Sequence, residues 1–330
     1  MIQRYAVAFG AGCAAAFLFA VSAEANPLAM LLAYLAPLPI MIATMGWGLD
    51  AGAIAAAASV AGLTLIAEPL SGMLFAASVA LPAWGLAAFA ATPIARYLPK
   101  RFAQVQPYPT AGAIVTLAAI IGMLGAAAVL TAVIVIYHGY AAGHEAVTQA
   151  LTAMAAEAFS EQDGAIDAEA AKVFAETMVR IGPAAIAAST LTMLCVNLYA
   201  AARSVQLSQR LQRPWLDLPT SLWISAPLGA VLIVCAAAAW ALPVPASQYF
   251  SLVAGGLGAA FALQGLAVAH ALSRGLRLRF VMLIALYACC VLRAKYTIPA
   301  LTLIGVVDAF VRLRIRAAVL PTTPRPTLQK

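Results

Sequence analysis

The sequence predicts an all-α fold, a polytopic bundle of about ten transmembrane helices, on three observations. First, 64% of the 330 residues are hydrophobic and only 9% are charged, whereas a soluble domain carries about 25% charged residues. Second, the apolar residues form runs near the length of about 20 residues that crosses a bilayer. Third, the basic residues gather in alternate breaks between these runs. We therefore expect a single integral membrane domain, residues 1–330, whose main partner is the lipid bilayer.

Ten apolar runs are separated by polar breaks, several of which contain proline or glycine. The runs cover residues 5–22, 27–46, 50–67, 70–95, 110–137, 181–202, 219–242, 248–272, 280–292 and 296–311. The first run, followed by "SAEAN", also fits a signal peptide cut after Ala25. A cleaved leader and a first membrane helix therefore both stay open, and the other nine crossings keep their orientation in either case.

The charges orient the chain. With the N-terminus inside and ten alternating helices, the inside segments hold fifteen of the nineteen lysines and arginines, as the positive-inside rule requires. Segment 138–180 then lies outside and holds seven acidic residues. This pattern predicts a bacterial cytoplasmic (inner) membrane protein with both termini in the cytoplasm. The net charge of +7 is read as a topology signal and not as a sign of nucleic-acid binding.

Segment 138–180 is expected to form an extracytoplasmic helical insertion. Val147, Leu151 and Met154 follow helical spacing, and "SEQDGAID" separates this stretch from a second amphipathic one. Gly164 and Asp167 suit a turn and a helix cap. The insertion is either a solvated connection on the outer surface or a lid over an outward-facing cavity.

The sequence offers no recognisable catalytic or metal-binding motif. The five cysteines lie in apolar runs without the paired spacing of a zinc or redox motif. The three histidines form no ligand set, and no Ser–His–Asp arrangement, carboxylate pair or phosphate-binding loop appears. We therefore expect no enzyme, no metal and no cofactor.

Two cations interrupt the last apolar stretch, in "CCVLRAKYTIPAL". Arg293 and Lys295 fall where the chain must fold back between two short limbs, and Pro299 disfavours a continuous helix. Residues two apart share a side only of an extended segment. The pair either anchors a short hairpin at the outer headgroups or binds an anionic group of a small solute.

Other polar residues at membrane depth are few. Asn197 and Gln264 are candidate solute contacts, although interhelical hydrogen bonds are their commoner role. Asp308 and Arg312 lie four residues apart, which predicts a structural ion pair near the inner surface.

Small residues recur at spacing four in the first run, at Ala8, Gly12 and Ala16, beside a second stripe of Ala6, Gly10 and Ala14. Such faces allow helices to approach closely. They serve packing within one chain or contact with a second membrane subunit.

Three stretches carry a family resemblance. "LAPLPIMIATMGWGLDAGAIAA" resembles the N-terminal signature of small-solute uptake proteins. "QGLAVAHALSR" and "LIGVVDAFVRLRIR", with Gly305, Asp308 and Arg314, resemble the C-terminal signatures of the YybS-like family of bacterial multi-pass membrane proteins. That family is similar at a distance to the S-components of energy-coupling-factor transporters. The resemblance implies a bound solute and a membrane coupling subunit that docks on Ala8, Gly12 and Ala16.

The sequence thus favours a membrane protein that binds or transports a small anionic solute. Arg293 and Lys295 would contact the anionic group, while Asn197 and Gln264 would add neutral contacts. The alternative is a membrane scaffold or assembly factor that binds other proteins through small-residue helix faces.

Overall fold

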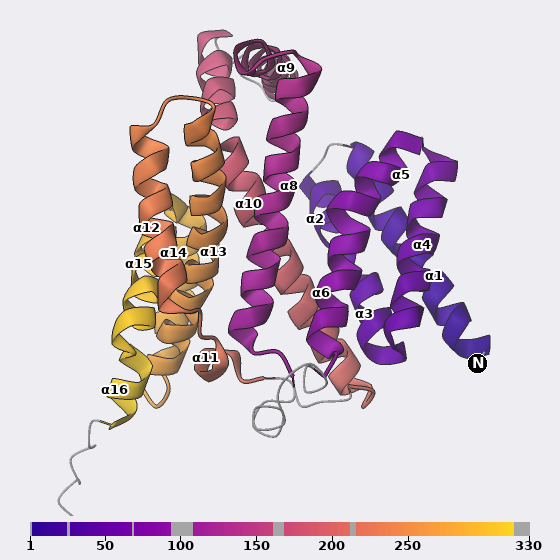
Figure 1. Ribbon diagram of the computed structural model, residues 1–330. Coiled ribbons are helices and arrows are strands. Elements are labelled where there is room, and N and C mark those ends of the chain that lie inside the picture. Colours follow the sequence, from indigo (N-terminus) through magenta and orange to yellow (C-terminus); the bar gives the residue numbers. More distant parts are fainter. Residues whose placement is uncertain are drawn as a thin grey trace, which may run out of the picture.

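The structure, a computed structural model, describes residues 2–24, 27–67, 69–93, 108–160, 168–211 and 216–319. All regular secondary structure in these ranges is helical, which confirms the expected all-α class (Figure 1). Gly164 and Asp167, the predicted turn and cap residues of the insertion, lie outside the described ranges.

The N-terminal helices form one side of the bundle (Figure 1). They are α1 (Ile2–Ala20), a 3-10 segment η1 (Val21–Glu24), α2 (Pro27–Tyr34), α3 (Pro37–Trp47), α4 (Leu49–Ile66), α5 (Pro69–Phe75), a π-helical turn η2 (Ala76–Ala80) and α6 (Leu81–Ala91). Proline begins α2, α3 and α5, a position where the missing N–H costs no helical hydrogen bond.

The remaining helices form the other side. They are α8 (Ala111–Ile136), α9 (Tyr140–Ser160), α10 (Ala168–Leu207), α11 (Leu218–Ser221), α12 (Ala226–Ala241), α13 (Ala246–Leu272), α14 (Arg279–Leu292), α15 (Ala294–Val311) and α16 (Leu313–Val319). Helix α13 is central here, because it packs against α8, α10, α12 and α15. Helix α10 joins the two sides by packing against α3 as well as α13.

The number of membrane helices corrects the prediction of ten. Within the described residues, eight helices are long and apolar enough to cross a membrane. Two of the ten expected runs form shorter helices, α12 with 16 residues and α14 with 14. At 1.5 Å per residue these measure about 24 Å and about 21 Å, less than a hydrocarbon core of about 30 Å. The eight long helices define a polytopic membrane bundle.

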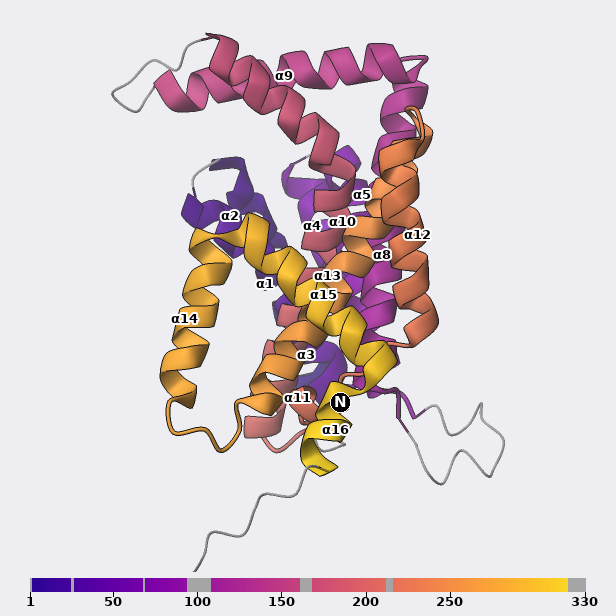
Figure 2. The same ribbon diagram turned by 90° about the vertical axis from the view of Figure 1, so that its left-hand side faces the viewer.

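Helix α9 lies across one end of the bundle (Figures 1 and 2). Helix α16 and the first residues of α1 lie at the opposite end (Figure 1). We call these the α9 end and the α16 end. Helix α10 has 40 residues, about 60 Å, so its first part extends beyond a bilayer and runs obliquely from the level of α9 (Figure 2). The expected amphipathic insertion is therefore α9 together with the first turns of α10.

The small-residue face of α1 packs within the chain. Ala8, Gly12 and Ala16 are buried, and α1 packs against α4. A Cβ atom added to Gly12 would lie 2.6 Å from the carbonyl oxygen of Ala55. The three residues for which the sequence suggested a docking subunit are thus covered by the protein's own helix.

Candidate functional site

A buried polar cluster connects five segments near the α16 end. Asp308 of α15 and Arg314 of α16 form an ion pair of 2.7 Å, with side chains only 0% and 6% exposed. The Nε atom of Arg314 donates a second bond of 3.1 Å to the same carboxylate oxygen. Every charge in this pair therefore has a partner, as burial at membrane depth demands.

Arg314 also donates hydrogen bonds to backbone carbonyls of α11 and of the non-helical segment that follows it. Its Nη1 donates to the carbonyl of Pro219 (2.8 Å) and its Nη2 to that of Leu222 (2.6 Å). The guanidinium stacks on the ring of Trp223 at 3.8 Å. Residues 222–225 are not helical, so their polar groups need such partners away from water.

Gln264 joins the same cluster from α13. Its Nε2 donates to Asp308 (2.9 Å) and to the carbonyl of Gly305 (3.2 Å), and its Oε1 accepts from the backbone N–H of Ile224 (2.8 Å). Both N–H groups and the oxygen of the amide have partners within the protein. Gln264 therefore fastens the non-helical segment to α13 and α15.

The predicted ion pair is corrected by this geometry. Asp308 pairs with Arg314, whereas Arg312 is exposed and caps α15 in the left-handed conformation (φ 57°), its N–H bonded to the Asp308 carbonyl. The i,i+4 argument assumed a continuous helix. Since α15 ends at Val311, the reversal at Arg312 turns α16 so that Arg314 reaches the carboxylate.

Asn197 is fully buried and bonds to backbone. Its Nδ2 donates to the carbonyls of Tyr34 and Met193, both at 2.8 Å. The Tyr34 carbonyl lies at the end of α2, where helical partners are missing. Asn197 thus links α10 to the break between α2 and α3.

Arg293 and Lys295 are exposed at the corner between α14 and α15. The backbone is not extended there, because α15 begins at Ala294 and includes Pro299. Thr297 closes the corner by donating to the carbonyls of Cys289 (3.0 Å) and Arg293 (3.2 Å). Figure 2 shows this corner below the level of α9 and on the far side of α13 from α12. The four proposed solute contacts therefore do not meet in one place.

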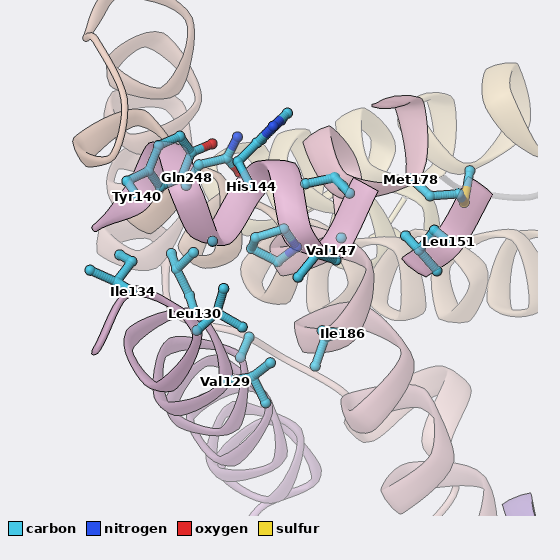
Figure 3. A pocket seen from close by; sticks show the side chains of 16 residues that line it. Val129, Leu130, Ile134, Tyr140, His144, Val147, Leu151, Met178, Ile186 and Gln248 are labelled. Carbon is cyan, nitrogen blue, oxygen red and sulfur yellow. The ribbon is translucent and has the colours of Figure 1, made fainter. Parts of the chain in front are cut away.

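An apolar cavity of about 200 Å³ lies beneath α9. Figure 3 shows its walls: Val129, Leu130 and Ile134 from α8, Tyr140, His144, Val147 and Leu151 from α9, Met178 and Ile186 from α10, and Gln248 from α13. Val147 and Leu151, which the sequence placed on the apolar face of the insertion, therefore line the cavity. Helix α9 is its roof.

Gln248 is a polar residue of this mostly apolar lining, as are Tyr140 and His144. Gln248 is 8% exposed, and within the described chain its Oε1 is buried without a hydrogen-bond partner. An unsatisfied buried acceptor costs about 1–3 kcal/mol. The sequence analysis missed Gln248, because an amide at the start of an apolar run does not reveal which helix face it occupies.

A larger groove of about 700 Å³ lies toward the α16 end. Its lining includes Val115 from α8, Val196 and Arg203 from α10, His270 from α13 and Tyr287 from α14. His270 and Tyr287 are joined by a hydrogen bond of 2.9 Å. Among the described residues, no group of three or more His, Cys, Asp or Glu side chains is arranged to hold a metal ion.

The fold and these sites define a polytopic integral membrane protein with two hollows at opposite ends of its bundle. The chain belongs to the family described as "Predicted membrane protein (DUF2232)", whose model matches residues 13–309. The match includes both α13 and most of α15, and with them Gln264 and Asp308. No curated protein and no solved structure matches the chain.

Proposed function

We propose that the protein binds a small, neutral, mostly apolar solute in the cavity beneath α9 and takes part in its passage across the membrane. The observation that carries this proposal is the unpartnered Oε1 of Gln248 in a mostly apolar lining. An acceptor in that position selects a molecule with one hydrogen-bond donor, such as an alcohol, a phenol or an amide.

The size of the cavity limits the solute. An apolar cavity of about 150 Å³ in another protein holds benzene, so about 200 Å³ suits roughly six to ten non-hydrogen atoms. Helix α9 packs against α8 and α10, so a solute that enters the cavity from this end would have to displace the roof. The cavity beneath α9 therefore favours the interpretation of segment 138–180 as a lid.

The orientation of the chain in the membrane is part of the same proposal. We assign the α9 end to the outside and the α16 end to the cytoplasm of a bacterial inner membrane, because the described arginines gather at helix ends on the α16 side. The role retains the solute binding that the likeness to YybS-like proteins and to S-components implies, and it involves no catalysis. A neutral solute in this cavity takes the place of the anionic solute that the sequence suggested at Arg293 and Lys295.

Ligand-induced stabilisation of the purified full chain in detergent tests the proposal. We expect cyclohexanol to raise the melting temperature more than cyclohexane does, since a ligand at 100 times its Kd adds about 2.7 kcal/mol to the stability of the native state. Gln248→Met, which keeps the volume but removes the acceptor, should abolish the preference for the alcohol.

A matched pair of glycine variants locates the binding. Gly182 and Gly125 are helical glycines at which an added Cβ meets no atom within 4 Å, but only Gly182 lines the cavity. Gly182→Leu should remove the response to cyclohexanol, and Gly125→Leu should retain it. Equal stabilisation by alcohol and hydrocarbon in the unmodified protein would contradict the proposal.

A scaffold function is the second candidate, and one observation favours it. Ala6, Gly10 and Ala14 form an exposed stripe on α1, and an added Cβ at Gly10 meets no atom within 4 Å. Such a stripe fits a transmembrane helix of another protein.

Site-specific photocrosslinking in native membranes tests this second function. A photoreactive side chain at position 10 should give one discrete adduct, whereas the same side chain at Gly125, which is also exposed, should give none. A lipid-only pattern at both positions would leave α1 without a protein partner.

A further inference from the structure

The groove near the α16 end has an apolar floor and is open on one side. Its floor is formed by α8, α10 and α13, with Ile114, Val196, Leu263 and Leu266 among the residues that line it. Helix α14 contributes Tyr287 to the lining and has no buried residue. Figure 2 shows α14 standing away from the bundle, connected to α13 and α15 at its two ends. An isolated apolar helix of this kind leaves a space that something apolar must fill.

The rim of the groove is basic. Arg203 of α10 lines it and donates to the neutral side chain of Gln206 at 2.7 Å. Among the described residues its guanidinium has no carboxylate within ion-pair distance. Asp217, the acidic residue of the lining, is already paired with Arg274 at 2.6 Å.

A further arginine adds to this excess of positive charge. His270 faces the groove and bonds to Tyr287. Arg279, at the start of α14, lies close enough to His270 to act on it electrostatically, as Arg274 does. Arg203 lines the groove, and Arg274 and Arg279 act on its His270, against the single carboxylate of Asp217 in the lining. The groove therefore favours an anionic group at its rim and an apolar body on its floor.

We infer that the groove binds an anionic lipid of the cytoplasmic leaflet. The phosphate lies at the rim beside Arg203, and one acyl chain occupies the floor between α10 and α14. Basic pockets between transmembrane helices on the cytoplasmic side suit such headgroups, and a volume of about 700 Å³ lies within the usual range for ligand sites, about 300–1,000 Å³. The site is separate from the cavity beneath α9 and does not depend on the solute proposed there, although its assignment to the cytoplasmic leaflet rests on the orientation proposed above.

Lipid binding to the detergent-purified full chain tests this inference. The probes are dioctanoyl phosphatidylglycerol, dioctanoyl phosphatidylcholine and glycerol 3-phosphate, each titrated and followed by native mass spectrometry. We expect tighter binding of the anionic lipid than of the zwitterionic one. Glycerol 3-phosphate should bind far more weakly, because it leaves the apolar floor uncovered.

Three variants separate headgroup recognition from simple filling. Arg203→Gln should weaken binding of the anionic lipid by about fivefold, the effect of one arginine near a charged headgroup. Arg316→Gln is the control, because Arg316 is exposed on α16 and does not line the groove. Val196→Trp should block both lipids without unfolding the protein, since Val196 is 52% exposed and the larger ring enters open space.

Three results would overturn the inference. Equal affinities for the two lipids would show that the groove is filled without recognition of charge. Equal losses in Arg203→Gln and Arg316→Gln would point to a diffuse surface potential. Unchanged binding in Val196→Trp, with the variant melting as the unmodified protein does, would place the lipid elsewhere.

Discussion

Replacing Asp308 with alanine should lower the free energy of unfolding by about 3–5 kcal/mol, the cost of leaving one charge of a buried pair without its partner. The Arg314 guanidinium would stay buried, with its side chain 6% exposed. Equilibrium unfolding of the detergent-solubilised protein measures the loss. The double variant Asp308→Leu, Arg314→Met should be more stable than the single variant, because it removes both charges.

The exposed pair at the same end is the matched control. Arg274 and Asp217 are bonded at 2.6 Å, but their side chains are 41% and 51% exposed. Exposed pairs contribute little to stability because water and salt screen them. Arg274→Ala should therefore cost only a small part of the loss in Asp308→Ala. Equal losses in the two variants would contradict the structural importance of the buried cluster.

Gly305→Ala should destabilise the protein by about 3 kcal/mol, the upper end of the range for overpacking. Helices α13 and α15 cross so closely that an added Cβ at Gly305 would lie 2.0 Å from the carbonyl oxygen of Phe261. That oxygen belongs to the α13 backbone and cannot turn aside, so the helices must separate. The separation would also lengthen the bond between Gln264 and the Gly305 carbonyl. Thermal unfolding in detergent reports the change.

A glycine on α13 provides the comparison. An added Cβ at Gly258 meets no atom within 4 Å, so Gly258→Ala should leave stability unchanged or raise it by up to about 1 kcal/mol through helix propensity. If the two alanine variants unfold at the same temperature, the close crossing at Gly305 is not what limits stability.

The two C-terminal motifs show which features of the polar cluster the sequence could predict. "QGLAVAHALSR" and "LIGVVDAFVRLRIR" were recognised separately, and the structure brings them together: Gln264 of the first bonds to Gly305 and Asp308 of the second. The likeness therefore marked the residues of a structural cluster. Periodicity could not reveal this role, because the hydrogen bonds join positions more than forty residues apart.

The candidate site was the least predictable part. Arg293 and Lys295 were predicted as solute contacts because charges in an apolar run are costly. In the structure both side chains are exposed at a helix corner. Gln248 was not predicted as a solute contact, although its Oε1 is buried without a hydrogen-bond partner in the described chain. Sequence reports the kind of residue at a position, whereas exposure and partners depend on which helices pack around it.

The sequence by itself determined the all-α class, the membrane location and the helical stretches of segment 138–180, because hydropathy and helical spacing are properties of consecutive residues. Only the tertiary structure decided that two of the ten apolar runs form short helices and that α9 covers a cavity. It also decided that Arg314, and not Arg312, forms the ion pair with Asp308. Each of these depends on where the backbone turns and which faces meet, and such contacts join residues that are distant in the chain.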